Sequence, residues 1–194
     1  MESNPFGYSS YAIHKQFLKV FGGVFRIYEP SGGLVLYVHM KEFKLKEEIH
    51  VYTDENKTSE VLTIQARSIV DFSAAYDVVD SLTQQKIGVL KRKGLKSTFL
   101  HDEWLIMDAN DLEIGLIKED SVILALIRRH VTNLVPQSFH GTIGATPVLK
   151  FSQHFNPFVL KMDLDFSEDY GNRLDRRMGI AAAVLLCAIE GKQQ

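Results

Sequence analysis

The apolar run near the end of this chain constrains the fold more than any other segment. Met178 to Ile189 reads MGIAAAVLLCAI and carries no charge. A membrane-spanning helix needs about 20 apolar residues, so this run is too short to cross a bilayer alone. A helix that is apolar all round is normally buried on all sides. Because the chain before it reads as strands, we expect a sheet wrapped around one helix over residues 176–190.

Composition indicates one ordinary globular domain. The chain has 194 residues, of which 45% are hydrophobic and 24% charged, and its formal net charge is -2. These values are typical of soluble proteins and do not point to nucleic acid as a partner. The single cysteine, Cys187, lies within the apolar run, where we expect a small, inert core residue. The N-terminus shows no secretory signal, so we expect a cytoplasmic protein that can visit a membrane surface.

Four strand–turn–strand units repeat along the first two thirds of the chain. An acidic residue opens each turn, and these four acids are separated by 25, 26 and 28 residues: Glu29, Asp54, Asp80 and Asp108. β-branched and aromatic residues flank each turn, which is the signature of a β-hairpin. Because an acid that opens a turn can accept hydrogen bonds from backbone N–H groups, we assign these four a structural role.

About four more strands follow the hairpins, over residues 122–127, 138–143, 148–151 and 158–162. The total of about twelve, with short connections, predicts a mainly β fold, a closed antiparallel barrel over residues 17–194 after an N-terminal extension of residues 1–16. Its interior would be too wide for its own side chains to fill, so the terminal helix is expected inside it.

Three arginines, Arg173, Arg176 and Arg177, precede this helix and are expected at the barrel mouth. Positive charge is unfavourable near a helix N-terminus unless it is paired. Asp169 and Asp175 are the nearby candidates for pairing.

Several motifs occur together in an order that resembles a known superfamily. They are the repeated hairpins, the run Gly88–Lys93, Lys96-Ser97 followed by Trp104, the segment Phe155–Phe158, and the terminal helix that begins at Asp175. Over about residues 17–190 the chain resembles the tubby C-terminal-like superfamily, in its LURP-one-related and phospholipid scramblase-like branch. The resemblance implies a twelve-stranded barrel around a central hydrophobic helix, as derived above.

The resemblance implies lipid-related functions. Tubby-type members bind phosphoinositide headgroups through lysines and arginines of the barrel surface. Scramblase members carry an acidic calcium segment before the helix and are linked to lipid movement between leaflets, whereas LURP-one-related members are associated with plant defence. This chain lacks the cysteine-rich run and the Pro-rich N-terminal region of the scramblases.

A basic run is the first candidate binding site. It comprises Lys86, Lys91, Arg92, Lys93 and Lys96, with no acid among them. Each such charge near an anionic leaflet contributes about 1 kcal/mol. The run therefore suits an anionic lipid headgroup, and its alternative role is a solvated outer face of a hairpin. Nucleic acid is not expected, because no recognition motif accompanies the run.

The acidic segment before the helix supplies weak calcium candidates, Asp163, Asp165 and Asp175. Alternate carboxylates at 163 and 165 can share a calcium ion, but the spacing does not fit an EF-hand loop. The alternative role is to neutralise the three arginines. We otherwise expect no metal and no cofactor.

The seven histidines are dispersed, and the chain has no Gly-x-Ser-x-Gly elbow, so we expect no enzyme. The function expected from the sequence is a non-catalytic binding or scaffold protein that binds phosphoinositide or another anionic lipid. The alternatives are scramblase-like phospholipid translocation and an enzyme that uses histidines at the barrel mouth, such as His101 and His154.

Overall fold

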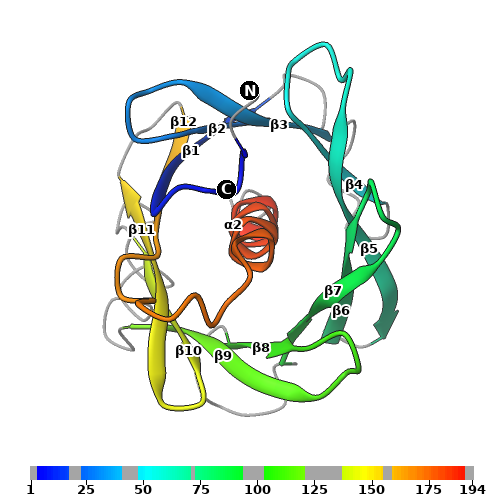
Figure 1. Ribbon diagram of the computed structural model, residues 1–194, viewed down its shortest axis with the longest axis vertical. Coiled ribbons are helices and arrows are strands. Elements are labelled where there is room, and N and C mark those ends of the chain that lie inside the picture. The colour runs from blue at the N-terminus through cyan, green and yellow to red at the C-terminus, as the bar shows by residue number, and fades with distance from the viewer. Residues whose placement is uncertain are drawn as a thin grey trace.

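The protein is a β-barrel with a helix through its centre (Figure 1). The computed structural model describes residues 4–17, 23–40, 48–70, 73–93, 103–120, 137–154 and 159–190. In these residues lie one helix, α2 (Arg176–Glu190), and twelve strands: β1 (Ser10–Phe17), β2 (Gly23–Tyr28), β3 (Leu34–Met40), β4 (Ile49–Tyr52), β5 (Glu60–Val70), β6 (Ser73–Asp80), β7 (Lys86–Arg92), β8 (Glu103–Met107), β9 (Glu113–Glu119), β10 (Ser138–Ile143), β11 (Thr146–His154) and β12 (Val159–Asp165).

The strands form a closed antiparallel meander, in which each strand pairs with its neighbours in sequence and β1 pairs with β12. The closing register runs from Ser10 opposite Asp165 to Gln16 opposite Val159. Full closure leaves no exposed sheet edge, which removes a route to aggregation. The predicted fold class is therefore confirmed.

The first strand corrects the expected domain boundary. β1 begins at Ser10, inside the segment 1–16 that we expected to precede the barrel. Tyr11, Ile13 and Lys15 alternate inward and are buried. A lysine at an inward position breaks the apolar alternation by which a strand is recognised in sequence. The structure accommodates it because its ammonium group donates a hydrogen bond of 2.5 Å to the carbonyl of Cys187, near the C-terminus of α2.

The four predicted hairpins are β2–β3, β4–β5, β6–β7 and β8–β9. The expected strands over 138–143, 148–151 and 158–162 correspond to β10, β11 and β12. The expected strand over residues 122–127 lies outside the described residues. The twelve strands that the structure describes therefore include β1 and do not include the strand expected over residues 122–127.

The four turns share one construction, which explains the acidic repeat. Asp80 accepts hydrogen bonds from the backbone N–H groups of Leu82 and Thr83, at 2.9 and 2.8 Å. The other three acids accept equivalent bonds in their own turns: Glu29 from Ser31 and Gly33, Asp54 from Asn56 and Thr58, and Asp108 from Asn110 and Leu112. The predicted capping role of the acids is confirmed.

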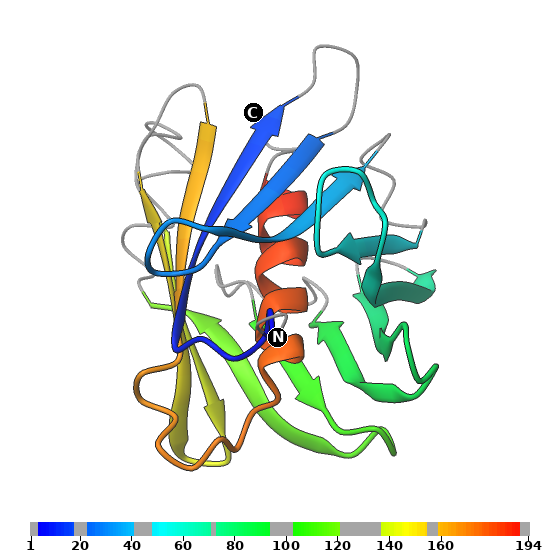
Figure 2. The same cartoon turned by 45° about the horizontal axis from the view of Figure 1, so that its top comes forward.

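The helix forms the centre of the core (Figure 2). Met178 and the residues from Ile180 to Ala188 are at most 4% exposed. Cys187 is buried, with its Sγ 3.8 Å from Sδ of Met162. Gly179 allows the close approach of helix and chain, because a Cβ there would lie 2.3 Å from the Phe166 ring. In the described part of the chain, no helix is both long and apolar enough to cross a bilayer.

Burial of the helix predicts the effect of a charge in its centre. Ala183 is fully buried, so Ala183→Asp would place an unpaired carboxylate in the core. We expect the variant to yield no folded monomer, measured by circular dichroism and size-exclusion chromatography. Ala145→Asp, in the exposed β10–β11 turn, is the matched control and should fold normally. A soluble, folded, monomeric Ala183→Asp protein would contradict the core assignment.

Candidate functional site

The basic run does not form one surface. Lys91 is exposed on the outer face of β7, and Lys93 follows two positions later on the same face. Arg92 lies on the inner face, opposite the buried Trp104. Lys86 is at the other end of the strand, about 17 Å from Lys91 along an extended chain. Lys96 lies outside the described residues.

Lys86 belongs to an ion network on the barrel surface. Its Nζ lies 2.9 Å from Oδ1 of Asp111, and Arg67 bonds both Asp111, at 2.7 Å, and Asp77, at 2.7 Å. Hydrogen bonds from Arg67 and Lys86 lower the pKa of Asp111 to about 2. Two cations and two carboxylates therefore neutralise one another, and Lys86 serves to tie β7 to the β8–β9 turn.

Inside the barrel, the charge of Arg92 affects the pKa of the buried phenol of Tyr76. Burial raises the pKa of Tyr76 to about 12, although the positive charge of Arg92 opposes the shift. Tyr76 is fully buried and its ring centroid lies 6.1 Å from that of Trp104. Arg92 is thus part of the interior and not of an outward anion site.

Cross-strand register places other lysines beside Lys93. The backbone N–H of Lys93 donates to the carbonyl of Glu103 on β8, at 2.9 Å, and Glu103 is directly opposite Lys118 on β9. Lys118 is in turn opposite His140 on β10, and His140 is opposite Lys150 on β11. We call Lys91, Lys93, Lys118 and Lys150 the basic row.

The basic row crosses five neighbouring strands, about 19 Å at the usual strand spacing. The Glu103 carboxylate lies 3.3 Å from Nζ of Lys93 and 3.3 Å from Nζ of Lys118. Burial raises the pKa of Glu103, but hydrogen bonds from these lysines outweigh it and hold the pKa below its ordinary value. Lys91 and Lys150 are exposed, and their side chains make no hydrogen bond or ion pair in the described structure. The row ends at Asp165, opposite Lys150.

The three calcium candidates occupy two different places. Asp163 and Asp165 lie on the outer face of β12, where Asp163 contacts His154 at 2.6 Å and Asp165 accepts a bond from the N–H of Ser167. Asp175 instead precedes α2 and contacts Arg177 at 2.5 Å. In the described ranges, no group of three or more His, Cys, Asp or Glu residues is placed to hold a metal ion.

The histidines that the structure describes lie singly on the outer surface. His154 is exposed and paired with Asp163, away from the mouth where the enzyme hypothesis placed it. His50 contacts Oε1 of Glu60 at 3.0 Å, and the hydroxyls of Thr63 and Ser81 contact the same oxygen. The carboxylate therefore separates the imidazole from both hydroxyls, so this cluster lacks the nucleophile–base contact of a catalytic triad. His101 lies outside the described residues.

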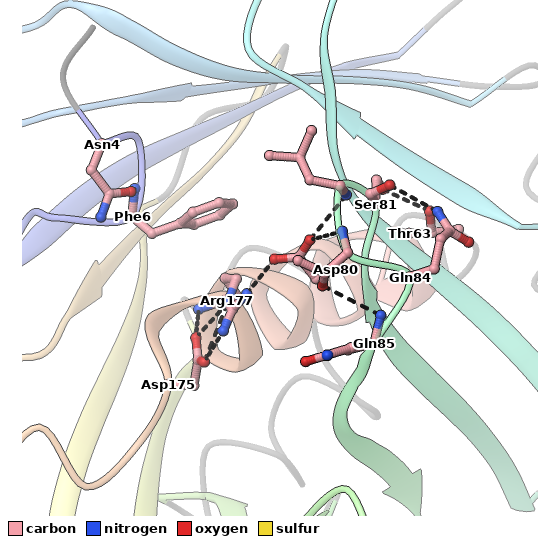
Figure 3. Close-up of polar contacts among 11 residues, drawn as sticks. Asn4, Phe6, Thr63, Asp80, Ser81, Gln84, Gln85, Asp175 and Arg177 are labelled. Atoms are coloured by element: carbon pink, nitrogen blue, oxygen red, sulfur yellow. Dashed lines mark hydrogen bonds and ion pairs between the residues drawn. The ribbon is translucent and has the colours of Figure 1, made fainter. Parts of the chain in front are cut away.

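The barrel mouth holds a network of ion pairs around the start of α2 (Figure 3). Asp175 caps the helix by accepting a hydrogen bond from the N–H of Arg177, at 2.9 Å. The Arg177 guanidinium bonds both Asp175 and, at 2.5 Å, Asp80 of β6. Arg176 contacts Asp169 at 3.4 Å. The predicted neutralisation by Asp169 and Asp175 is confirmed for Arg176 and Arg177, whereas Arg173 donates only its backbone N–H to Asp169. Asp80 is a third partner that local sequence did not indicate.

A cavity of about 480 Å³ opens above this network. We call it the mouth cavity, and its lining includes Phe6, Leu82, Asp80, Asp175 and Arg177. Figure 3 shows the Phe6 ring projecting from the N-terminal segment toward the Asp80 turn and the first turn of α2. The cavity thus has apolar walls and a charged floor.

A family model described as LURP-one-related matches residues 34–187. The chain belongs to the LURP-one-related family. The match begins at the first residue of β3 and ends in α2, so the barrel of this LURP-one-related protein includes two strands, β1 and β2, that precede the matched region. Curated proteins and solved structures gave no match.

The mouth network predicts acid sensitivity. Backbone hydrogen bonds and Arg177 lower the pKa of Asp80, and Arg177 lowers the pKa of Asp175 although burial opposes it. A lowered folded-state pKa gives stability that is present above the unfolded value, about 3.9, and is lost as the pH falls through the folded value. We expect Asp80→Asn, which retains the turn-capping oxygen, to lower the free energy of unfolding at pH 7 by about 1 kcal/mol.

The measurement is urea unfolding of both proteins at pH 7, 5, 4 and 3. The stability difference should shrink below pH 4, as Asp80 of the parent protein becomes protonated. Glu168→Gln is the control, because Glu168 is exposed in the neighbouring loop. A constant difference over the whole pH range would argue against the ion pair.

Proposed function

We propose that this protein is a non-catalytic binding domain that docks on anionic lipid through the basic row. The observation that carries the proposal is the alignment of four outward lysines on the alternate strands β7, β9 and β11, with the side chains of two of them unpaired in the described structure. Glu103 lies between Lys93 and Lys118, and the Asp120–His140 pair lies between Lys118 and Lys150. Membership of the LURP-one-related family is consistent with a binding role.

The shape of the row supports a surface contact. Lysines spread over about 19 Å on a convex barrel wall suit several headgroups of a membrane better than a single small ligand in a pocket. The Lys93–Glu103–Lys118 contacts orient two of the lysines without cancelling the charge of the row. Phosphoinositide headgroups, with several phosphates each, match this density of positive charge.

Scramblase-like translocation has less support. The apolar segment that would enter a bilayer is the buried centre of the core, so inserting it would require the barrel to open. Catalysis likewise has no arrangement in its favour in the described residues, where His50 is separated from the nearby hydroxyls by Glu60.

The lipid proposal predicts a salt-sensitive loss of binding. We expect the triple variant K91Q/K118Q/K150Q to bind phosphatidylserine and phosphoinositide vesicles about 100-fold more weakly than the parent protein, since each lysine contributes about 1 kcal/mol. Vesicle flotation at low and at physiological salt measures it, and the parent protein should bind more weakly at higher salt.

The matched control is K57Q/K161Q/R173Q, which removes the same amount of charge from positions outside the row. It should retain binding. Equal losses of vesicle binding in the two triple variants would show that binding depends on net charge and not on the basic row. An absence of binding by the parent protein at low salt would refute the lipid proposal.

A further inference from the structure

The charges of this protein are divided between the two ends of the barrel. Because the strands alternate in direction, all turns over residues 29–33, 53–59, 81–85, 108–112 and 144–145, and the loop over 166–175, lie at the end where α2 begins. Figure 2 shows the β8–β9 and β10–β11 turns together with the loop into α2 at this end. We call it the mouth end.

The mouth end is acidic. Its six segments contain eight carboxylates and two cations, a net charge of -6, whereas the whole chain carries -2. The rest of the chain therefore carries +4. An anionic lipid or a nucleic acid would be repelled at the mouth end and a cationic partner attracted.

Exposed apolar side chains also gather there. In the described part of the chain, the large hydrophobic residues with high exposure are Leu82 (76%), Leu112 (63%) and Tyr170 (94%), all within mouth-end segments. Of these three, only Leu82 lines the mouth cavity. Leu82 is exposed to solvent at the wall of the mouth cavity, where a bound side chain would cover it.

The floor of the mouth cavity favours a cation over an anion. All three nitrogens of the Arg177 guanidinium donate to carboxylate oxygens, of Asp175 or Asp80, at 2.5–2.9 Å. An anion would have to displace one of these carboxylates. Each carboxylate has about four acceptor positions. Asp175 already accepts four hydrogen bonds from Arg177, whereas Asp80 accepts three, so Asp80 can accept one more. Arg176 also lines the cavity and pairs with Asp169, so the three carboxylates and two guanidiniums of the network leave one excess negative charge.

We propose that the mouth cavity accepts a lysine or arginine side chain from a basic segment of a protein partner. The cationic head would pair with Asp80, and the aliphatic stem would lie between Phe6 and Leu82. Long basic side chains commonly bury the stem on apolar surface while the head stays in a polar environment. A cavity of about 480 Å³ has room for such a side chain. With the basic row on a membrane, the protein would then act as an adaptor between lipid and a basic partner.

The test uses fluorescence anisotropy without vesicles. The probe is a short labelled peptide in which lysines alternate with leucines, and two reference peptides carry norleucine or glutamate in place of lysine. The lysine peptide should bind at low salt, at least about tenfold more tightly than the norleucine peptide, and the glutamate peptide should not bind.

Two variants separate the stem from the head. Leu82→Ser should weaken binding of the lysine peptide about tenfold, as expected for losing one buried leucine contact. Leu112→Ser changes another highly exposed leucine, which lies outside the cavity, and should have no effect. Asp80→Asn should abolish the discrimination between lysine and norleucine, with folding verified by circular dichroism.

Three results would overturn the proposal. They are no binding of the lysine peptide at low salt, equal affinities for the lysine and norleucine peptides, and equal effects of the two leucine variants. The variant K91Q/K118Q/K150Q should bind the peptide normally, so a failure of the lipid proposal and a failure of this one are distinguishable.

Discussion

The burial of one apolar helix inside the sheet is the constraint on which the rest of this structure depends. A closed barrel of twelve strands encloses more space than its own inward side chains can fill, and an apolar helix without partners is unstable in water. Each element therefore needs the other. The fit is close, since Gly179 leaves no room for a Cβ against Phe166, and Met178 approaches Gly88 of β7 in the same way.

The two ends of the helix are held by opposite charges. Asp175 caps the N-terminus, and the Lys15 ammonium group bonds the carbonyl of Cys187 near the C-terminus. Both arrangements agree with the helix dipole. Arg176 and Arg177 would oppose the dipole, but Asp169, Asp80 and Asp175 neutralise them. These contacts link α2 to both β1 and β6, so the position of the helix depends on strands from distant parts of the chain.

The division of charge follows from how the turns are built. A tight turn leaves backbone N–H groups to be satisfied, and in four hairpins an acid at the first turn position satisfies them. A meander brings every second turn to the same end of the barrel. The acids that cap these turns therefore gather at one end and make it negatively charged. The lysines of the basic row lie on the strands themselves, so binding of lipid and of a basic protein segment would use separate surfaces.

Local patterns in the sequence were sufficient for the hairpins, the helix over residues 176–190 and the capping role of the acids, because hydrophobic alternation and turn chemistry act over a few residues. They failed for β1, where Lys15 occupies an inward position and is stabilised there by its hydrogen bond to a helix carbonyl. They also grouped Lys86, Lys91 and Arg92 as one site. In β7, however, Lys86 lies at the opposite end of the strand from Lys91, and Arg92 lies on the opposite face.

The sequence by itself thus determined the element types, the single domain and the family. Only the tertiary structure decided which charges meet: Lys93 with Lys118 and Lys150, and Arg177 with Asp80, which is 97 residues away. The physical reason is that cross-strand register depends on barrel closure and on irregularities such as the shift between Ile106 and Met107, and these are properties of the assembled sheet.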